Sequence, residues 1–559
     1  MRLGRLTALA TLIGTLCALP VASVLVNLFA EGTPGVWGHL AQTVLPEYAA
    51  NTFWLLIGVG IGVVTVGVTT AWLTTMHEFP GRRVFEWSLI LPLAMPAYVI
   101  AFVYTDFLQF VGPVQTSLRD VTGWSKEDYW FPDVRSLGGA IAMFILVLYP
   151  YVYLLARAAF LERSVSLLEA GRILGLGSMG SFFRVALPLA RPAVAAGAAL
   201  ALMETIADFG AVAYFGVPTF TTGIYQAWFS MGDRVVSAQL SAALLGFVLL
   251  VLFLERLSRG RKRYHETSQR TRPPSRQRLA RAWAAAATVT CAVPLVLGFL
   301  LPGGLLLDMA INEGDAQFGL RFVQLVLNSV TLAAITSALL VALAVLMAYN
   351  ARLYPGVFSL GLNRLVSLGY AVPGLVIAVG VLIPLAQFDN ALDAWLRSSW
   401  GISTGLLLTG SLVALVFAYV VRFFSVGLQT VEASLIKVRP SMDDAARSLG
   451  CGPAESLLRI HVPIVARGLF TAGLLVFVDV MKELPATLVM RPFNFDTLAT
   501  QVYTLAQDER LAEASTASLA IVAAGLVPLI AISRNIAKAH RVPPAELAPY
   551  GAAAEVAPR

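Results

Sequence analysis

Long apolar runs separated by short polar stretches dominate the pattern of this sequence. A run of about 20 apolar residues can cross a bilayer as a helix, and such runs recur along the whole chain. Twelve runs cover roughly residues 6–28, 52–75, 87–110, 137–160, 193–215, 237–256, 281–302, 328–350, 364–387, 405–428, 468–490 and 515–534. Lipid cannot satisfy the hydrogen bonds of open sheet edges, so we predict a helix for each run.

Composition agrees with a bilayer as the solvent. Hydrophobic residues make up 57% of the chain and charged residues only 13%, against roughly 25% charged residues in soluble domains. The mean hydropathy is +0.74. The three cysteines, Cys17, Cys291 and Cys451, have no metal-binding or redox spacing, so we interpret them as small apolar residues.

The first run allows two interpretations. "MRLGR" and "ALPVAS" are typical of the basic start and the small-residue end of a signal peptide. The run is long for that purpose, and "CALP" at 17–20 has a counterpart in "CAVP" at 291–294. We therefore favour a retained helix.

Positive charge is concentrated in a few loops, so the net charge of +7 does not indicate a nucleic-acid partner. The most basic stretch, residues 257–280, is predicted to be cytosolic by the positive-inside rule. The same rule places the N-terminus and the C-terminal tail in the cytoplasm. We favour a solvated tether for the basic stretch over a lipid-headgroup or regulatory site.

A repeat relates the two parts of the chain. "LLEAGRILGLGSMGSFFRVALP" at 167–188 aligns with "MDDAARSLGCGPAESLLRIHVP" at 442–463 at a shift of 275, and "AMPAYVIA" at 94–101 parallels "AVPGLVIA" at 371–378. Both parts start inside, so the repeat is parallel, about an axis along the membrane normal. We predict an all-α integral membrane protein with six-helix halves at 1–256 and 281–534, a linker at 257–280 and a cytosolic tail at 535–559.

The repeated polar stretches fall in the cytosolic loops between the fourth and fifth spans, at 162–191 and 431–466. Ser166-x-x-Glu169 and Ser441-x-x-Asp444 have the spacing of capping boxes at a helix start. A Gly-x-Gly turn follows in each loop, and Pro188 or Pro463 is expected to end a second short helix. Topology alone does not require such ordered loops, so we predict docking elements for a cytosolic partner.

These loops resemble the "EAA" coupling loops in permease subunits of bacterial binding-protein-dependent ABC importers. The resemblance implies the type I permease fold, with each loop docked on one subunit of a cytosolic ATP-binding homodimer. It assigns coupling to Glu169, Ala170, Gly175, Pro188, Asp444, Ala445, Ala446, Gly450 and Pro463. The chain departs from the pattern at Gly171 and at Asp444. A local interpretation stays open, in which the acids only cap their helices.

No Gly-x4-Gly-Lys-Ser/Thr phosphate loop occurs in the sequence. We therefore predict that the chain is not an enzyme and binds no cofactor, with ATP and Mg²⁺ held by the partner subunit.

Ionisable residues inside apolar spans are costly and often functional. The candidates for the translocation path are Glu204, Asp208, Asp479 and Glu483, and the last two flank Lys482. In the resembled family the fifth span of each half lines the path. Carboxylates there would suit a hard cation, although no residue is a certain metal ligand. Alternatively, Lys482 pairs with a neighbouring acid, or these groups lie at the aqueous outer end of the spans and hold helices together.

Two further segments, "ADFGAVAYFGVPTFTTGIYQAW" and "MKELPATLVMRPFNFDTLATQVY", resemble fused permeases of ferric-iron importers. This resemblance implies a bacterial inner-membrane protein that receives ferric iron from a periplasmic binding protein. Thiamine or another small solute is the alternative cargo. A major-facilitator secondary transporter would also have twelve spans, but it would not need two matched polar loops, and a membrane-embedded enzyme would need a convergent polar site.

Overall fold

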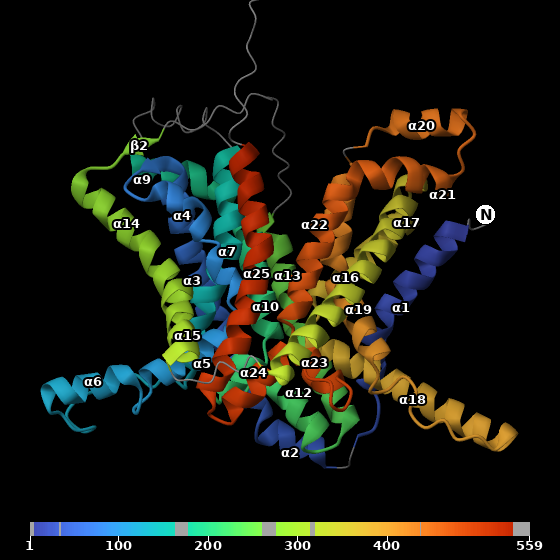
Figure 1. Cartoon of the computed structure of the whole chain (residues 1–559), viewed down its shortest axis with the longest axis horizontal. Helices are drawn as coiled ribbons and strands as arrows, with labels where there is room; N and C mark the ends of the chain where they lie inside the picture. Colours follow the sequence, from blue (N-terminus) through green and yellow to red (C-terminus); the bar gives the residue numbers. More distant parts are fainter. Residues whose placement is uncertain are drawn as a thin grey trace, which may run out of the picture.

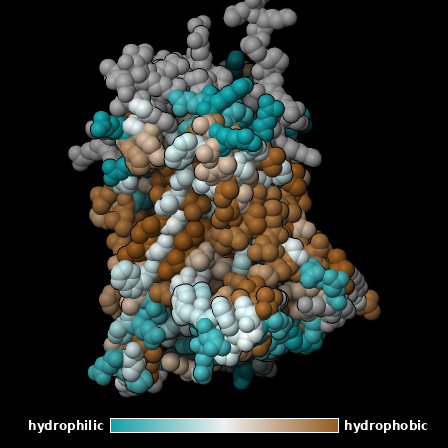
Figure 2. Space-filling view, turned by 90° about the vertical axis from the view of Figure 1, so that its left-hand side faces the viewer, coloured by the Kyte–Doolittle hydropathy of each residue, from teal (hydrophilic) through white to brown (hydrophobic). Residues whose placement is uncertain are grey.

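A computed structural model describes residues 5–32, 35–162, 177–259, 276–312, 319–436 and 438–539. Within these residues, twelve helical stretches are long and apolar enough to cross a membrane. The long helices form one bundle, with α20, α9, β2 and the N-terminus at one end and α2, α6 and α12 at the other (Figure 1). An apolar belt separates polar caps on the face drawn in Figure 2. The predicted all-α membrane fold is confirmed.

The elements before the linker are almost entirely helical. They are α1 (Arg5–Asn27), α2 (Val36–Gln42), α3 (Leu45–Met76), β1 (His77–Glu78), α4 (Arg82–Ser88), η1 (Leu91–Ala94), α5 (Ala97–Leu108), α6 (Pro113–Thr122), α7 (Leu137–Glu162), α9 (Ser178–Ser181), η2 (Phe182–Ala186), α10 (Leu187–Ala207), α11 (Gly210–Tyr214), α12 (Phe220–Phe229) and α13 (Arg234–Arg259).

The elements from residue 277 onward follow a similar order. They are β2 (Gln277–Arg278), α14 (Arg281–Leu295), η3 (Val296–Leu300), α15 (Leu301–Asn312), α16 (Leu320–Leu353), α17 (Val357–Ser367), η4 (Leu368–Ala371), α18 (Gly374–Trp400), α19 (Leu412–Leu435), α20 (Pro440–Ser448), α21 (Pro453–Ser456), η5 (Leu457–His461), α22 (Val462–Met481), α23 (Pro485–Met490), α24 (Leu498–Gln507) and α25 (Leu511–Ala539).

Two predicted spans are displaced because their apolar runs contain breaks. The run at 87–110 holds Pro92 and Pro96, and the chain there forms the 3₁₀ turn η1 before α5 begins at Ala97. In the run at 364–387, η4 likewise precedes Pro373, the N-cap of α18. Proline lacks the N–H of a helix interior and pushes the residue before it out of the helical region. The third spans therefore begin later than the hydropathy pattern indicates.

Equivalent features recur at a near-constant spacing. Asn51 donates to the Pro218 carbonyl at 2.9 Å, and Asn328, 277 positions on, donates to the Asp496 carbonyl at 3.0 Å. Thr219 and Thr497 each start a helix with a capping box. The π-helical segments η2 and η5 lie 275 positions apart. Local backbone geometry thus follows the repeat in the sequence.

The first helix of each part packs on helices of the other part. Helix α1 lies against α18 and α17 as well as α13, and α15 lies against α25 and α5. Tyr104 of α5 donates a hydrogen bond to the Leu297 carbonyl at 2.6 Å. Thr7 of α1 donates to the Asn350 side chain at 3.0 Å. These crossings join the two parts into one body.

The end of the basic linker is fixed to the bundle. Residues 277–278 form the short strand β2, which pairs in parallel with β1 at His77 and Glu78. The Glu86 carboxylate lies 3.6 Å from the Arg276 guanidinium and 2.5 Å from that of Arg82. Burial and the neighbouring Arg82 lower the pKa of Arg276. Residues 276–278 are therefore not a free tether, and α13 extends three residues past the predicted boundary at 256.

Gly380 permits the close crossing of α1 and α18. A Cβ atom at this position would lie 2.3 Å from the Pro20 carbonyl oxygen, so even alanine would force two backbones apart. We expect Gly380→Ala to cost roughly 1–3 kcal/mol of stability. Thermal unfolding of the purified protein in detergent measures this loss. Gly246→Ala, where no atom lies within 4 Å, is the matched control. Equal melting temperatures for the two variants would contradict this account of the crossing.

Candidate functional site: a central pocket and an inner-face elbow

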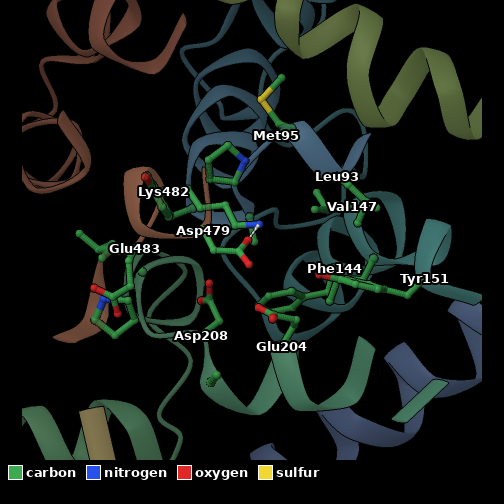
Figure 3. Close-up of a pocket in the computed structure, with 18 of the residues that line it drawn as sticks. Leu93, Met95, Phe144, Val147, Tyr151, Glu204, Asp208, Asp479, Lys482 and Glu483 are labelled. Atoms are coloured by element: carbon green, nitrogen blue, oxygen red, sulfur yellow. Dashed lines mark ion pairs between the residues drawn. The ribbon is translucent and has the colours of Figure 1, made fainter. Parts of the chain in front are cut away.

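A pocket between the two parts of the bundle collects the acids that the sequence singled out. Its space for water-sized solutes is about 100 Å³. Glu204 and Asp208 line it from one side, and Asp479 and Glu483 line it from the other. Figure 3 shows the carboxylates of Glu204, Asp208 and Asp479 facing the same open space. Two bases, Arg422 and Lys482, also contribute to the lining, so acids outnumber bases by four to two.

Glu204 and Asp479 occupy equivalent places, 275 positions apart, but have different partners. Tyr370 of η4 donates a hydrogen bond to Glu204 at 2.6 Å, which links α10 to the second part of the chain. Asp479, in the last turn of α22, pairs with Lys482, the C-cap of that helix, with 2.9 Å between Oδ1 and Nζ (Figure 3). The predicted pairing of Lys482 with a neighbouring acid is therefore present, and that acid is Asp479.

Asp208 and Glu483 mark the points where the fifth spans break. Asp208 ends α10, and its Oδ1 accepts the backbone N–H of Ala211 at 2.8 Å at the start of α11. Glu483 follows α22 and accepts the N–H groups of Ala486 and Thr487, at 2.9 and 3.1 Å, at the start of α23. Both carboxylates supply acceptors that lipid cannot offer to the exposed N–H groups. The runs at 193–215 and 468–490 are therefore each interrupted, rather than single helices as predicted.

Arg422 was not among the residues that the sequence singled out. Its guanidinium lies 3.1 Å from the Glu483 carboxylate, and the side chains are 11% and 1% exposed. A lone arginine inside the apolar run at 405–428 was the available signal, because such a charge needs a buried partner. Within the described residues, no group of three or more His, Cys, Asp or Glu side chains is placed to hold a metal ion.

A second site lies at one end of the bundle, formed by α20, α21 and η5 (residues 440–461), which we call the elbow. Helix α20 stands apart from the bundle and turns back into α21 (Figure 1). Gly450 has a φ of +81°, a conformation that favours glycine at the end of a helix. The predicted sharp turn at this position is confirmed.

The elbow differs from its prediction in three details. Helix α20 begins at Pro440 with Arg439 as its N-cap, so the predicted capping box of Ser441 and Asp444 is wrong. Proline fits the first helical turn and needs no side-chain cap. Pro463 does not end a helix, because the wider π-helical turn of η5 precedes it and the chain continues directly into α22. The Ala446 side chain is buried, at 2% exposed, rather than presented on the surface of the elbow.

The other predicted coupling residues of the second loop lie on the surface. The Asp444 side chain is 69% exposed and pairs with Arg447 of the same helix at 2.6 Å. Ala445, Gly450 and Pro463 are also exposed. In the first loop, Pro188 is exposed at the start of α10. Glu169, Ala170 and Gly175 lie outside the described residues.

Residues 63–263 match the family described as the binding-protein-dependent transport system inner membrane component. This match and the full-length relatives support a permease of the binding-protein-dependent ABC importers. The permease is 26% identical over 539 residues to the Fe(3+)-transport system permease protein FbpB 2 of Haemophilus influenzae, with 95% of this chain and 98% of that relative covered. The major-facilitator interpretation is set aside.

Two other relatives show how the similarity is distributed. The ferric transport system permease protein FbpB of Actinobacillus pleuropneumoniae is 23% identical, with 90% of this chain and 73% of the relative covered. The molybdenum transport system permease protein ModB of Escherichia coli is 29% identical over 205 residues, with 35% of this chain and 86% of the relative covered. The permease therefore resembles the ferric relatives over most of its length and the molybdenum relative over about a third.

The pair of Arg422 and Glu483 gives a direct test of the pocket. Arg422→Met leaves the Glu483 charge buried without a counter-ion, which typically costs about 3–5 kcal/mol. We expect a large drop in the thermal unfolding temperature of the purified permease. Adding Glu483→Gln should recover most of the loss. Arg397→Met, at a side chain that is 64% exposed, is the control. A melting temperature of Arg422→Met equal to that of this control would show that the pair is not needed.

Proposed function

We propose that this permease moves ferric iron from a periplasmic binding protein into the cytoplasm by alternating access. The observation that carries the proposal is the central pocket, where four carboxylates face a space lined by only two bases. Ferric iron is a hard cation that favours oxygen ligands. The names of the relatives that match over most of this chain concern ferric transport. Thiamine or another small solute remains the alternative cargo.

Within the pocket, Glu204 and Asp479 are the better candidates for contact with cargo. Oδ1 of Asp208 and both carboxylate oxygens of Glu483 already accept backbone N–H groups of α11 and α23. Glu204 and Asp479 each have one side-chain partner, Tyr370 and Lys482, which could exchange for a passing cation. We infer that Asp208 and Glu483 stabilise the breaks in the fifth spans. Glu204 and Asp479 would contact the cargo.

We infer that the chain consists of two parallel six-helix halves around this pocket. The recurring caps, π-helical segments and broken fifth spans support the division. The elbow and its first-half equivalent would each dock on one subunit of a cytosolic ATP-binding homodimer. Asp444 and Ala445 are accessible for that contact, with Gly450 at the turn. Glu169, Ala170 and Gly175 would act in the same way in the first loop.

The remaining assignments follow from this arrangement. We propose the bacterial inner membrane as the location, with both termini and the elbow on the cytoplasmic side. The binding protein would dock at the opposite end, near α2 and α12. The permease would hydrolyse no ATP itself and bind no cofactor, with ATP and Mg²⁺ held by the partner subunit. No nucleic acid takes part.

The cargo assignment is tested by uptake of radioactive ferric iron. The permease and its ATP-binding subunit are reconstituted in proteoliposomes with the iron-loaded binding protein. We expect Glu204→Gln combined with Asp479→Asn to lower ATP-driven uptake at least tenfold, because the cargo loses two negative charges. Asp128→Asn, at an exposed loop acid, is the control. Wild-type uptake by the double variant would refute contact with cargo, and vesicles without the ATP-binding subunit should show no uptake.

The docking role of the elbow is tested at its turn. Gly450→Val places a β-branched side chain at a φ of +81°, where such residues are strained, so the elbow must change shape. We expect uptake and binding-protein-stimulated ATP hydrolysis to fall together, while membrane levels stay normal. Gly452→Ala, at a φ of −71° with no atom within 4 Å, should behave as wild type. Normal hydrolysis and uptake in Gly450→Val would count against docking at this turn.

A further inference from the structure

Asp443, which precedes the predicted coupling residue Asp444, contacts the transmembrane helices. The guanidinium of Arg352, in the last turn of α16, contacts Oδ2 of Asp443 through Nη2 at 2.7 Å and through Nε at 3.0 Å. Its Nη1 and Nη2 also donate to the carbonyls of Leu435 and Val438, both at 2.8 Å. Arg352 therefore joins the end of α16 to the end of α19 and to α20.

The second oxygen of Asp443 is held by η5. Nε2 of His461 lies 2.6 Å from Oδ1 of Asp443, and the His461 side chain is fully buried. The His461 ring packs against Tyr349, one turn before Arg352 on α16, with 5.2 Å between ring centroids. The Tyr349 hydroxyl donates to the Pro453 carbonyl at 3.0 Å. Helix α20 and the α21–η5 segment therefore both contact the last turns of α16.

Burial distinguishes Asp443 from its neighbour. The side chains of Asp443 and Arg352 are 13% and 18% exposed, whereas that of Asp444 is 69% exposed. Hydrogen bonds between charged groups at these distances are short and strong, and water competes little for a half-buried pair. Asp444 pairs only along its own helix, with Arg447. Asp443 is thus the acid of α20 that ties the elbow to the transmembrane helices.

In the sequence, the first part of the chain carries no charged side chains at the three equivalent positions. At the 277-residue spacing of the second spans, Arg352 corresponds to Thr75, whose hydroxyl bonds the Ala71 carbonyl of its own helix. At the 275-residue spacing of the loops, Asp443 and His461 correspond to Leu168 and Ala186, which carry no charge. Within the described residues, Trp72, which corresponds to Tyr349, packs on Phe182 of η2 with 5.0 Å between ring centroids.

We propose that Asp443, Arg352 and His461 form a clamp that transmits movement of α20 to α16. The proposal rests on the proposed function, in which α20 docks on the ATP-binding subunit. The three clamp residues touch neither cargo nor nucleotide. They are positioning residues, and their loss should separate ATP hydrolysis from transport.

The experiment compares two neighbouring acids in the complete importer. Uptake of ferric iron and ATP hydrolysis are measured in the same proteoliposomes for wild type, Asp443→Asn and Asp444→Asn. We expect Asp443→Asn to keep hydrolysis within about twofold of wild type, while iron moved per ATP falls about tenfold. Asp444→Asn should keep the wild-type ratio. An unchanged ratio in Asp443→Asn, or a parallel fall of uptake and hydrolysis, overturns the proposal.

A distance measurement keeps the clamp testable in the permease alone. Spin labels are placed at Leu449, which follows α20, and at Leu327 of α16, which are 83% and 58% exposed, in a chain whose three cysteines are replaced by serine. We expect Asp443→Asn to broaden the distribution of label distances and Asp444→Asn to leave it as in wild type. Equal widths in all three proteins overturn the clamp. Absence of ATP-driven uptake by wild type would contradict the proposed function instead, and the distances would still decide on the clamp.

Discussion

Hydrogen bonds from backbone N–H groups to buried carboxylates determine where the helices of this bundle can break. A bilayer offers no partners for the exposed N–H groups at a helix start, so a break inside the apolar belt needs a side chain that accepts them. Asp208 and Glu483 meet this need for α11 and α23. Arg422 then neutralises Glu483, which would otherwise be a buried unpaired charge. The pocket exists because these bonds let the fifth spans stop short.

The same breaks explain how a signal at one end of the bundle could reach its middle. From Pro453 to Met481, α21, η5 and α22 run as one uninterrupted helical stretch. This stretch joins the elbow to the break at Glu483, so a shift of the elbow would move one wall of the pocket. Asp479, near the end of α22, and Glu204, near the end of α10, lie where the two moving walls would meet. One wall of the pocket and the elbow thus lie at opposite ends of the same helical stretch.

The sequence predicted the elements whose signals are local. Twelve spans and the turn at Gly450 could be derived because apolar length and glycine freedom are properties of short segments. The breaks in the third and fifth spans were missed, because hydropathy counts apolar residues and overlooks what Pro96 or Asp208 does to hydrogen bonding. Pro463 was misjudged as a helix end, since nothing in the pattern indicates the π-helical turn before it. Tyr370, Arg422 and Arg352 were missed for another reason. Their partners lie 166, 61 and 91 positions away, so only the packed bundle brings them together.

The central claim is that the acid pocket opens to opposite sides of the membrane as nucleotide binds. The most direct measurement is labelling of Glu204→Cys, in a chain whose native cysteines are replaced by serine, with a thiol reagent that cannot cross the membrane. The reagent is added to either side of proteoliposomes that hold the complete importer. We predict that labelling from one side in the absence of nucleotide changes to labelling from the other side when ATP and the loaded binding protein are present. Labelling from the same side under both conditions would contradict the account.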